Sequence, residues 1–358
     1  MPPSALSSPD MKAVLCKAWG PPASLVVEEA PSPAPGPGRV VVAVRAAGVN
    51  FPDVLIVQGK YQIKPELPFS PGNEIAGVVK RVGEGVRGFM PGDPVIALIG
   101  WGGFAEEVAV DEKKLAPMPA GVDYTVAAAF GVTYATSYHA LKDRARLAAG
   151  ETLLVLGAAG GVGLAAVELG KLLGARVIAA ASSEAKLAAC RERGADAVID
   201  YEREDLREAI RALTDGKGVD VVVDPVGGRW TEPAVRGLAW KGRYLVVGFA
   251  AGDIPKIPLN LVLLKGSAIV GVYWGDFTRR EPRAAAENFE QLIAWLRAGK
   301  IRPLVSATYP LERAAEALED VMNRKVRGKA VLVTGAPPPA ADTGETTVRL
   351  SARPTGSS

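Results

Sequence analysis

The feature that most constrains this chain is a glycine-rich turn placed between an apolar run and an alanine-rich segment. The apolar run covers residues 153–156, and the turn reads Gly157-Ala-Ala-Gly160-Gly161-Val162-Gly163. Glycine lets the backbone approach a pyrophosphate closely, and the N-terminus of the following helix offers free amides and a partial positive charge. The usual G-x-G-x-x-G pattern is modified, because Ala158 stands at its first glycine position. The alternative is a plain tight turn, but the strand–turn–helix context favours a dinucleotide-binding site.

The segments around this turn predict the architecture. From about residue 124, long alanine-rich segments alternate with short Val/Leu/Ile runs, which is typical of parallel βαβ units in a doubly wound α/β sheet. The predicted strands are 152–156, 176–180, 197–199, 219–223, 244–247 and 268–272. Before residue 125, short strands split by Gly and Pro indicate a compact β-rich unit, and residues 304–333 return to strand–helix–strand.

These textures predict a division of the chain. With 358 residues, two domains are the natural expectation. Residues 336–358 are rich in Pro, Thr and Ser, with almost no bulky apolar residues, and are expected to be disordered. The predicted parts are a flexible extension at 1–10, a β-rich domain at 11–130 completed by 300–335, a dinucleotide-binding domain at 131–299 and the tail at 336–358.

The end of the second predicted βαβ strand indicates which dinucleotide binds. Enzymes that prefer NAD carry an acidic residue there, which binds the ribose 2′-hydroxyl. Here the strand is followed by Ser182 and, four residues on, Lys186, while Tyr201 follows the next strand. Hydroxyls and a cation suit a 2′-phosphate, so the sequence predicts NADPH (NADP+) as the cofactor. The alternative is a Ser helix cap beside a solvated Lys186.

Composition excludes several function classes. The net charge is +3, with Lys and Arg dispersed among Asp and Glu, which does not indicate nucleic-acid binding. Cys16 and Cys190 are the only cysteines, so neither a disulfide framework nor a cysteine-rich zinc site is expected. No signal peptide and no apolar run of membrane-spanning length is recognised, and a cytoplasmic protein without membrane contact is predicted.

Further motifs support a family resemblance over about residues 11–335. They include Asn50-Phe-Pro-Asp53, Gly59-Lys-Tyr61, Pro71-Gly72-Asn73-Glu74, Gly100-Trp-Gly-Gly-Phe-Ala-Glu and Gly328-Lys329-Ala-Val-Leu. Together with the glycine turn, they resemble the zinc-independent, zeta-crystallin-like quinone oxidoreductase branch of the medium-chain dehydrogenase/reductase superfamily. The resemblance implies a GroES-like β-rich catalytic domain, a Rossmann domain, and a homodimer in which strands near 268–272 pair across subunits.

The resemblance also bears on zinc. Zinc-dependent members carry Cys where Asn50 lies and His where Asn73 lies, with another Cys near the start of the Rossmann domain. Neutral amides are poor zinc ligands, Glu74 alone cannot hold the metal, and the region of Phe130 offers no thiolate. His139, the only histidine, is interpreted as a packing or capping residue. No metal is expected.

The activity implied by the resemblance is NADPH-dependent hydride transfer to a quinone or a related α,β-unsaturated carbonyl. Two alternatives are an enoyl thioester reductase and a nucleotide-binding regulatory or structural protein with vestigial activity. An arginine run at 279–283 either meets an anionic substrate or forms a solvated loop, and the solvated loop is favoured.

The resemblance assigns roles residue by residue. Asn50 is expected to donate to the acceptor oxygen, Tyr61 to donate a hydrogen bond or proton, and Asp53 to orient the cofactor. Each has a plainer alternative, a turn residue for Asn50 and Asp53 and apolar packing for Tyr61. The expected cofactor-binding residues are Thr133 at the nicotinamide or its ribose, Gly160, Gly161, Val162 and Gly163 at the pyrophosphate, Ser182, Lys186 and Tyr201 at the 2′-phosphate, and Val247, Gly248 and Phe249 beside the nicotinamide.

Overall fold

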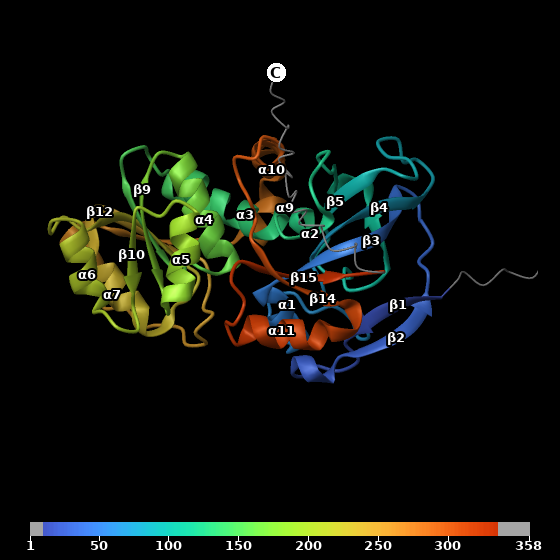
Figure 1. Ribbon diagram of the computed structural model, residues 1–358, viewed down its shortest axis with the longest axis horizontal. Helices are drawn as coiled ribbons and strands as arrows, with labels where there is room; N and C mark the ends of the chain where they lie inside the picture. The colour runs from blue at the N-terminus through green and yellow to red at the C-terminus, as the bar shows by residue number, and fades with distance from the viewer. Residues whose placement is uncertain (1–9, 336–358) are drawn as a thin grey trace, which may run out of the picture.

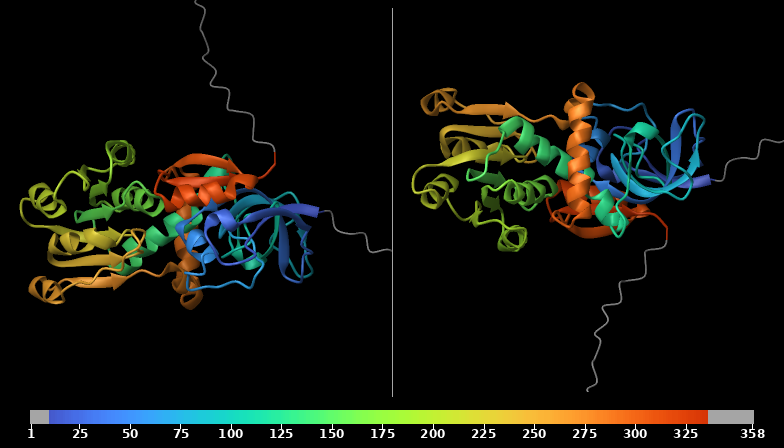
Figure 2. Two further views of the ribbon diagram at one scale, coloured as in Figure 1. Left: turned by 90° about the horizontal axis from the view of Figure 1, so that it is seen from below. Right: turned by 90° about the horizontal axis from the view of Figure 1, so that it is seen from above.

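A computed structural model describes residues 10–335, so residues 1–9 of the predicted extension and the predicted tail at 336–358 lie outside the described residues. The described chain forms two lobes, each built around one large sheet (Figure 1). Helices α9 (Trp274–Arg280) and α10 (Pro282–Arg297) lie where the lobes meet, and α10 is the long orange helix of Figure 2. No helix among residues 10–335 combines the length and hydropathy that a bilayer span needs.

The first lobe, here called the β lobe, holds a mixed seven-stranded sheet. Its order is β14-β15-β3-β4-β5-β7, and β6 also pairs with β3. The strands are β3 (Arg39–Val49), β4 (Glu74–Val82), β5 (Pro94–Leu98), β6 (Glu107–Asp111), β7 (Leu115–Pro117), β14 (Val305–Pro310) and β15 (Lys329–Val333). A separate hairpin joins β1 (Asp10–Leu15) to β2 (Val26–Pro31). Because β15 pairs antiparallel with β3, the C-terminal return is part of this lobe.

The second lobe, here called the βα lobe, holds a six-stranded sheet whose strands are all parallel. Its order, β10-β9-β8-β11-β12-β13, reverses direction at β8, as in doubly wound folds. The strands are β8 (Thr152–Leu156), β9 (Arg176–Ala181), β10 (Ala197–Asp200), β11 (Val219–Asp224), β12 (Leu238–Val246) and β13 (Ala268–Gly271). All six predicted strands are present. The sequence placed the start of β12 too late, because Trp240-Lys241-Gly242 interrupts its apolar pattern where the ladder shifts register.

Helices cover both sheets. Those of the βα lobe are α4 (Gly161–Leu172), α5 (Glu184–Glu192), α6 (Leu206–Leu213), α7 (Thr231–Arg236) and α8 (Asn260–Lys265). The β lobe carries α1 (Phe51–Val57) and α11 (Ala314–Met322), while α2 (Tyr124–Ala128) and α3 (Gly131–Tyr138) lie at the junction (Figure 1). The predicted domain boundaries, 130/131 and 299/300, fall at the start of α3 and just after α10, and this division stays a prediction.

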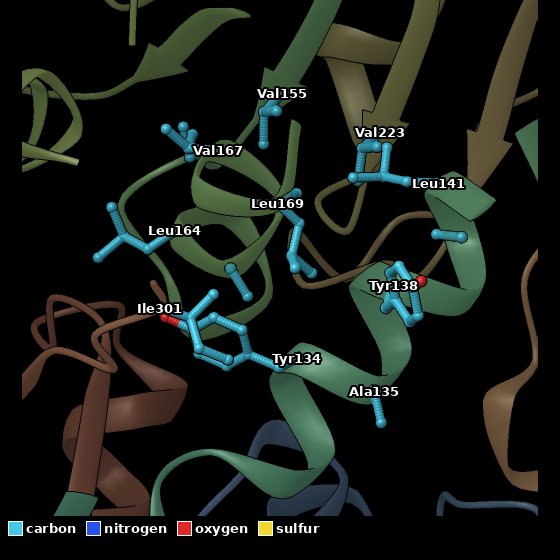
Figure 3. Packing of buried hydrophobic residues seen from close by; sticks show 14 of the residues in the cluster. Tyr134, Ala135, Tyr138, Leu141, Val155, Leu164, Val167, Leu169, Val223 and Ile301 are labelled. Atoms are coloured by element: carbon cyan, nitrogen blue, oxygen red, sulfur yellow. The ribbon is translucent and has the colours of Figure 1, made fainter. Parts of the chain in front are cut away.

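The junction is held by a continuous apolar core. In Figure 3, Tyr134 of α3 lies against Ile301 and near Leu164 of α4, and Leu141 lies toward Val223 of β11. Helix α3 ends at Tyr138, and the chain continues as a wider π-helical turn from His139 to Ala145. This core fixes α3, and with it Thr133, against the start of α4.

Candidate active site and cofactor site

The glycine turn forms the start of α4 at the carboxyl end of β8. Gly160 precedes the helix in an extended conformation, and no side chain caps the helix. Gly157 has a positive φ of 56°, and a Cβ at Gly163 would lie 2.4 Å from the carbonyl oxygen of Gly157. The turn therefore needs glycine for its own close packing. It leaves the first amides of a twelve-residue helix available to an anion at the point where the sheet order reverses.

Two cations and two hydroxyls gather beyond the ends of β9 and β10. The Lys186 ammonium donates to the Ser182 hydroxyl at 3.0 Å, and Tyr201, buried against Trp230 at 4.5 Å between ring centroids, lies beside Ser182. Burial and then the positive charge of Arg324 lower the pKa of Lys186. The structure thus brings together all three residues that the sequence predicted for a 2′-phosphate.

Arg324 is a residue that sequence reasoning missed. It lies in the turn between α11 and β15, in the β lobe, with a positive φ of 58°. Glu202, the carboxylate facing Lys186, is itself paired with Arg229 at 2.5 Å. Lys186 and Arg324 therefore give the corner beyond the ends of β9 and β10 a net positive charge, which suits a phosphate dianion.

Residues 247–249, which the sequence predicted beside the nicotinamide, are held in place by Asp224 at the end of β11. The amides of Val247 and Gly248 donate to the Asp224 carbonyl at 3.0 and 3.3 Å. The buried Asp224 carboxylate accepts the amides of Val226 and Gly227 and the hydroxyls of Thr231 and Tyr244. Phe249 covers Gly227, where an added Cβ would lie 2.8 Å from its ring. Asp224, which sequence reasoning missed, thus fixes the loops after β11 and β12 side by side.

Asn50 lies in a closed polar cluster. Its amide nitrogen donates to Asn73 Oδ1 at 2.9 Å and to Glu74 Oε1 at 2.7 Å, and its Oδ1 accepts from Lys329 at 2.5 Å. Both N–H groups of the Asn50 amide are therefore engaged within the protein. The predicted donation from Asn50 to an acceptor oxygen requires one of these bonds to be exchanged. Lys329 belongs to the Gly328-Lys329 motif, but the sequence did not identify it as a site residue.

Asp53 belongs to a short helix that the sequence did not predict. It is the third residue of α1, and its Oδ2 accepts the Asn50 amide at 2.8 Å in a capping box. The side chain is fully buried, and Oδ1 has no hydrogen-bond partner in the described part of the chain. Burial is the main cause that raises the pKa of Asp53 to about 7. The capping box agrees with the alternative in which Asp53 is a local turn residue. Its carboxyl also titrates near neutrality.

This raised pKa predicts how stability depends on pH. An unfolded carboxyl has a pKa near 3.9, so between about pH 4 and 7 the folded chain holds a proton that the unfolded chain has lost. The stabilising difference is present at low pH and is lost as the pH rises through about 7. We expect the thermal midpoint of the wild type to fall by several degrees more than that of Asp53→Asn between pH 5 and 8.

The control for this measurement is Asp123→Asn. Asp123 also accepts a backbone amide at a helix start, from Thr125 at 2.7 Å, but it is exposed. This variant should follow the wild-type pH profile. Parallel profiles for the wild type and Asp53→Asn would contradict the assignment.

Tyr61 lies beyond α1 and packs on the core of the β lobe. Burial, followed by the neighbouring Tyr273, raises the pKa of Tyr61 to about 12. Tyr273, which precedes α9 and is 42% exposed, is another residue not predicted for the site. The two hydroxyls lie beside each other, and a tyrosine hydroxyl can donate a hydrogen bond to a carbonyl oxygen.

Thr133 contacts the glycine turn at residues 157–163 from the side of α3. A Cβ at Gly161 would lie 2.8 Å from the Thr133 methyl carbon, and the buried hydroxyl donates to the Ala129 carbonyl at 3.3 Å. Thr133 thus lies against the glycine turn, and its contact with the nicotinamide or its ribose stays a prediction.

The remaining candidates have structural partners. His139 contacts Asp143 at 2.8 Å and stacks on Phe277 at 3.9 Å, which fits the packing interpretation. Among residues 10–335, no group of three His, Cys, Asp or Glu side chains could hold a metal ion. The exposed arginine run is ion-paired within its own helices: Arg279 and Arg280 with Asp276, and Arg283 with Glu287. The favoured interpretation was right about solvent exposure but wrong about the loop, because these arginines lie in α9 and α10.

Comparisons with known proteins bear on the whole chain. Residues 36–120 match the alcohol dehydrogenase GroES-like domain family, and residues 161–296 match the zinc-binding dehydrogenase family. A quinone oxidoreductase-like protein 2 homolog of Nematostella vectensis is 41% identical over 90% of this chain and 89% of its own length. A probable oxidoreductase of Mycobacterium abscessus has a solved structure that is 42% identical, with a TM-score of 0.82 over 91% of this chain and 100% of that one.

A third likeness concerns a structure that holds a cofactor. The Escherichia coli quinone oxidoreductase, solved in complex with NADPH, is 29% identical, with a TM-score of 0.82 over 90% of this chain and 99% of that one. The two domain matches, the two-lobed architecture and these whole-length likenesses agree with one another. The chain is an oxidoreductase that belongs to the quinone oxidoreductase branch of the medium-chain dehydrogenase/reductase superfamily.

Proposed function

We propose that this protein uses NADPH to reduce an electron-poor carbonyl compound, a quinone or an α,β-unsaturated ketone, without a catalytic zinc ion. One observation supports the proposal most strongly. The chain has both a glycine turn at the start of α4 and a positively charged cluster beyond the ends of β9 and β10, which consists of Ser182, Lys186, Tyr201 and Arg324. The similar Escherichia coli enzyme is solved with NADPH, which supports the same cofactor here.

The residues present fit this cofactor along its whole length. The amides at 161–163 would hold the pyrophosphate, Ser182, Lys186, Tyr201 and Arg324 would hold the 2′-phosphate, and Thr133 and residues 247–249 would hold the nicotinamide end. The bound NADPH supplies the hydride. The protein aligns the acceptor and binds its carbonyl oxygen, for which the Tyr61 and Tyr273 hydroxyls are the available donors. Such acceptors spread the incoming negative charge onto oxygen, so donors of this kind suffice without a Lewis acid.

Steady-state kinetics test the proposal. NADPH oxidation is measured with naphthoquinone, phenanthrenequinone and crotonyl-CoA, and each is repeated with NADH. We expect turnover of a quinone with NADPH to exceed turnover of the thioester. A thioester rate higher by orders of magnitude would assign an enoyl thioester reductase instead. Binding of NADPH without turnover of any acceptor would indicate a regulatory or structural protein.

Metal analysis tests the zinc-free part of the proposal. Asn50 donates to Asn73 and Glu74, and Lys329 donates to Asn50 and Glu74 with an ammonium that would repel a dication. We expect purified protein to hold much less than one zinc ion per chain by mass spectrometry, and a chelator to leave NADPH oxidation unchanged. Stoichiometric zinc together with chelator-sensitive activity would refute this part.

We also propose that two copies pair along β13, as the family resemblance implies. β13 is the last strand of the six-stranded sheet, and large apolar side chains beside it are exposed. They include Trp240, Ile254, Leu259, Leu263 and Leu264, each at least 68% exposed. Exposed apolar patches of this kind mark interfaces. Pairing of two copies of β13 about a twofold axis would cover this open edge of both sheets.

Light scattering on the eluting protein tests this pairing. The wild type should have the mass of two chains, and Leu263→Asp combined with Leu264→Asp should shift it toward one chain, because a carboxylate is not tolerated in a buried apolar contact. Ile63→Asp serves as the control and should stay dimeric, because it replaces an exposed apolar residue of the β lobe in the same way. A monomeric wild type would refute the proposal.

A further inference from the structure

Lys329 is a buried cation whose ammonium reaches three acceptors at once. Its Nζ donates to Glu74 Oε1 at 2.7 Å, to Asn50 Oδ1 at 2.5 Å and to the Val49 carbonyl at 3.1 Å. The Lys329 and Glu74 side chains are 4% and 1% exposed. Buried charges are retained only when they are paired and fully hydrogen-bonded, and here every donor of the ammonium has a partner.

Gly328, the residue before Lys329, contacts the glycine turn at residues 157–163, here called the cofactor turn. The Gly328 amide donates to the Ala159 carbonyl at 2.8 Å, and Gly328 forms a parallel bridge with Gly160. A Cβ at Gly161 would lie 3.0 Å from Lys329 Cδ. The Gly328 backbone and the aliphatic part of the Lys329 side chain therefore lie against the cofactor turn of the βα lobe. The Lys329 ammonium lies in the polar cluster of the β lobe.

This contact also determines how the Asn50 amide is oriented. A lysine ammonium only donates, so the oxygen of Asn50 must face Lys329 and its nitrogen must face Asn73 and Glu74. Glu74 continues the chain of contacts, because its Oε2 accepts the Val132 amide, next to Thr133, at 2.9 Å. Lys329 thus links the Asn50 end of α1, the start of α3 and the cofactor turn.

We propose that Lys329 is a positioning residue that couples occupancy of the cofactor turn to the alignment of Asn50 and α1. The inference rests on the proposed function, because the partner of the turn is the proposed NADPH. It assigns Lys329 no contact with the acceptor. Its removal should slow hydride transfer within the loaded enzyme more than it weakens NADPH binding.

The test uses full-length Lys329→Met combined with Glu74→Gln, which removes both buried charges together and leaves neither unpaired. The control is Lys325→Met, an exposed lysine of the same connection that pairs with Asp320. Single-turnover hydride transfer at saturating NADPH should fall by about 100-fold in the double variant, as for a misaligned reacting pair. The dissociation constant for NADPH, measured by calorimetry, should change much less, and the control should match the wild type in both.

Hydrogen exchange gives a readout that needs no acceptor. NADPH should slow exchange of peptides covering residues 50–57 in the wild type and in the control, and should leave them unchanged in the double variant. A double variant with the wild-type transfer rate, or with NADPH-induced protection of 50–57 intact, overturns the proposal.

A second variant covers failure of the double variant to fold. Lys329→Arg keeps the charge opposite Glu74, but a planar guanidinium cannot reproduce three converging bonds from one nitrogen, so a lowered transfer rate is again expected. An unchanged rate and unchanged protection in this variant overturn the proposal. A wild type that binds no NADPH or reduces no acceptor counts against the proposed function rather than against this coupling.

Discussion

Lys186→Ala is expected to weaken NADPH binding by about 10- to 100-fold and to leave NADH binding within about twofold, because one charged hydrogen bond contributes about 1.5–3 kcal/mol. The Lys186 ammonium lies 3.0 Å from Ser182 Oγ, beside Tyr201, in the corner proposed to hold the 2′-phosphate. NADH lacks this phosphate and has nothing to lose there. Arg324→Ala should give the same selective loss, because its charge reaches the same corner from the β lobe.

The matched control is Arg191→Ala on the same helix as Lys186. Arg191 has the same charge and lies within one turn or two of Lys186, but its guanidinium is paired with Glu184 at 2.5 Å. Calorimetric titrations of the wild type and the three variants with NADPH and NADH give the comparison. Equal losses for the two cofactors in Lys186→Ala and Arg324→Ala would refute the 2′-phosphate assignment, and a selective loss in Arg191→Ala would reduce it to a long-range effect of net charge.

The contrast between Lys186 and Arg324 shows what sequence reasoning reached. The glycine turn, Ser182 and Lys186 span one βαβ unit and the first turn of the next helix, α5, so local spacing was enough to place them together. The six parallel strands followed from the same periodicity. Arg324 reaches this corner only because the chain returns to the β lobe after α10, a contact that no local pattern encodes.

The polar cluster around Asn50 was beyond prediction for a related reason. Asn50 and Asp53 were recognised from motifs, but their chemistry depends on partners supplied by other strands. The β3–β15 pairing brings Lys329 beside Val49 and Asn50, and the β3–β4 pairing brings Glu74 there. A sequence motif therefore identified the residues, whereas the loss of free donors on Asn50 and the raised pKa of Asp53 arise from tertiary contacts.

The glycine turn itself carries the other large effect. Gly163→Ala is expected to destabilise the fold by about 1–3 kcal/mol, the usual cost of overpacking a tight contact. Its Cβ would lie 2.4 Å from the Gly157 oxygen and 2.7 Å from Ala158 Cα, and both are backbone atoms that cannot move aside. The turn must open to relieve this contact, so NADPH binding should be lost as well. Thermal unfolding and calorimetry measure the two losses.

Gly160→Ala separates packing from ligand binding at the same turn. Its φ of −79° suits any residue, and its Cβ would meet the Gly157 oxygen at 3.4 Å, an ordinary contact. The melting temperature should therefore stay near that of the wild type. NADPH affinity should still fall, because the added methyl group takes the space through which the pyrophosphate approaches the backbone. A Gly160→Ala protein with both stability and affinity unchanged would mean that the anion does not approach this face of the turn, and the dinucleotide site would have to lie elsewhere.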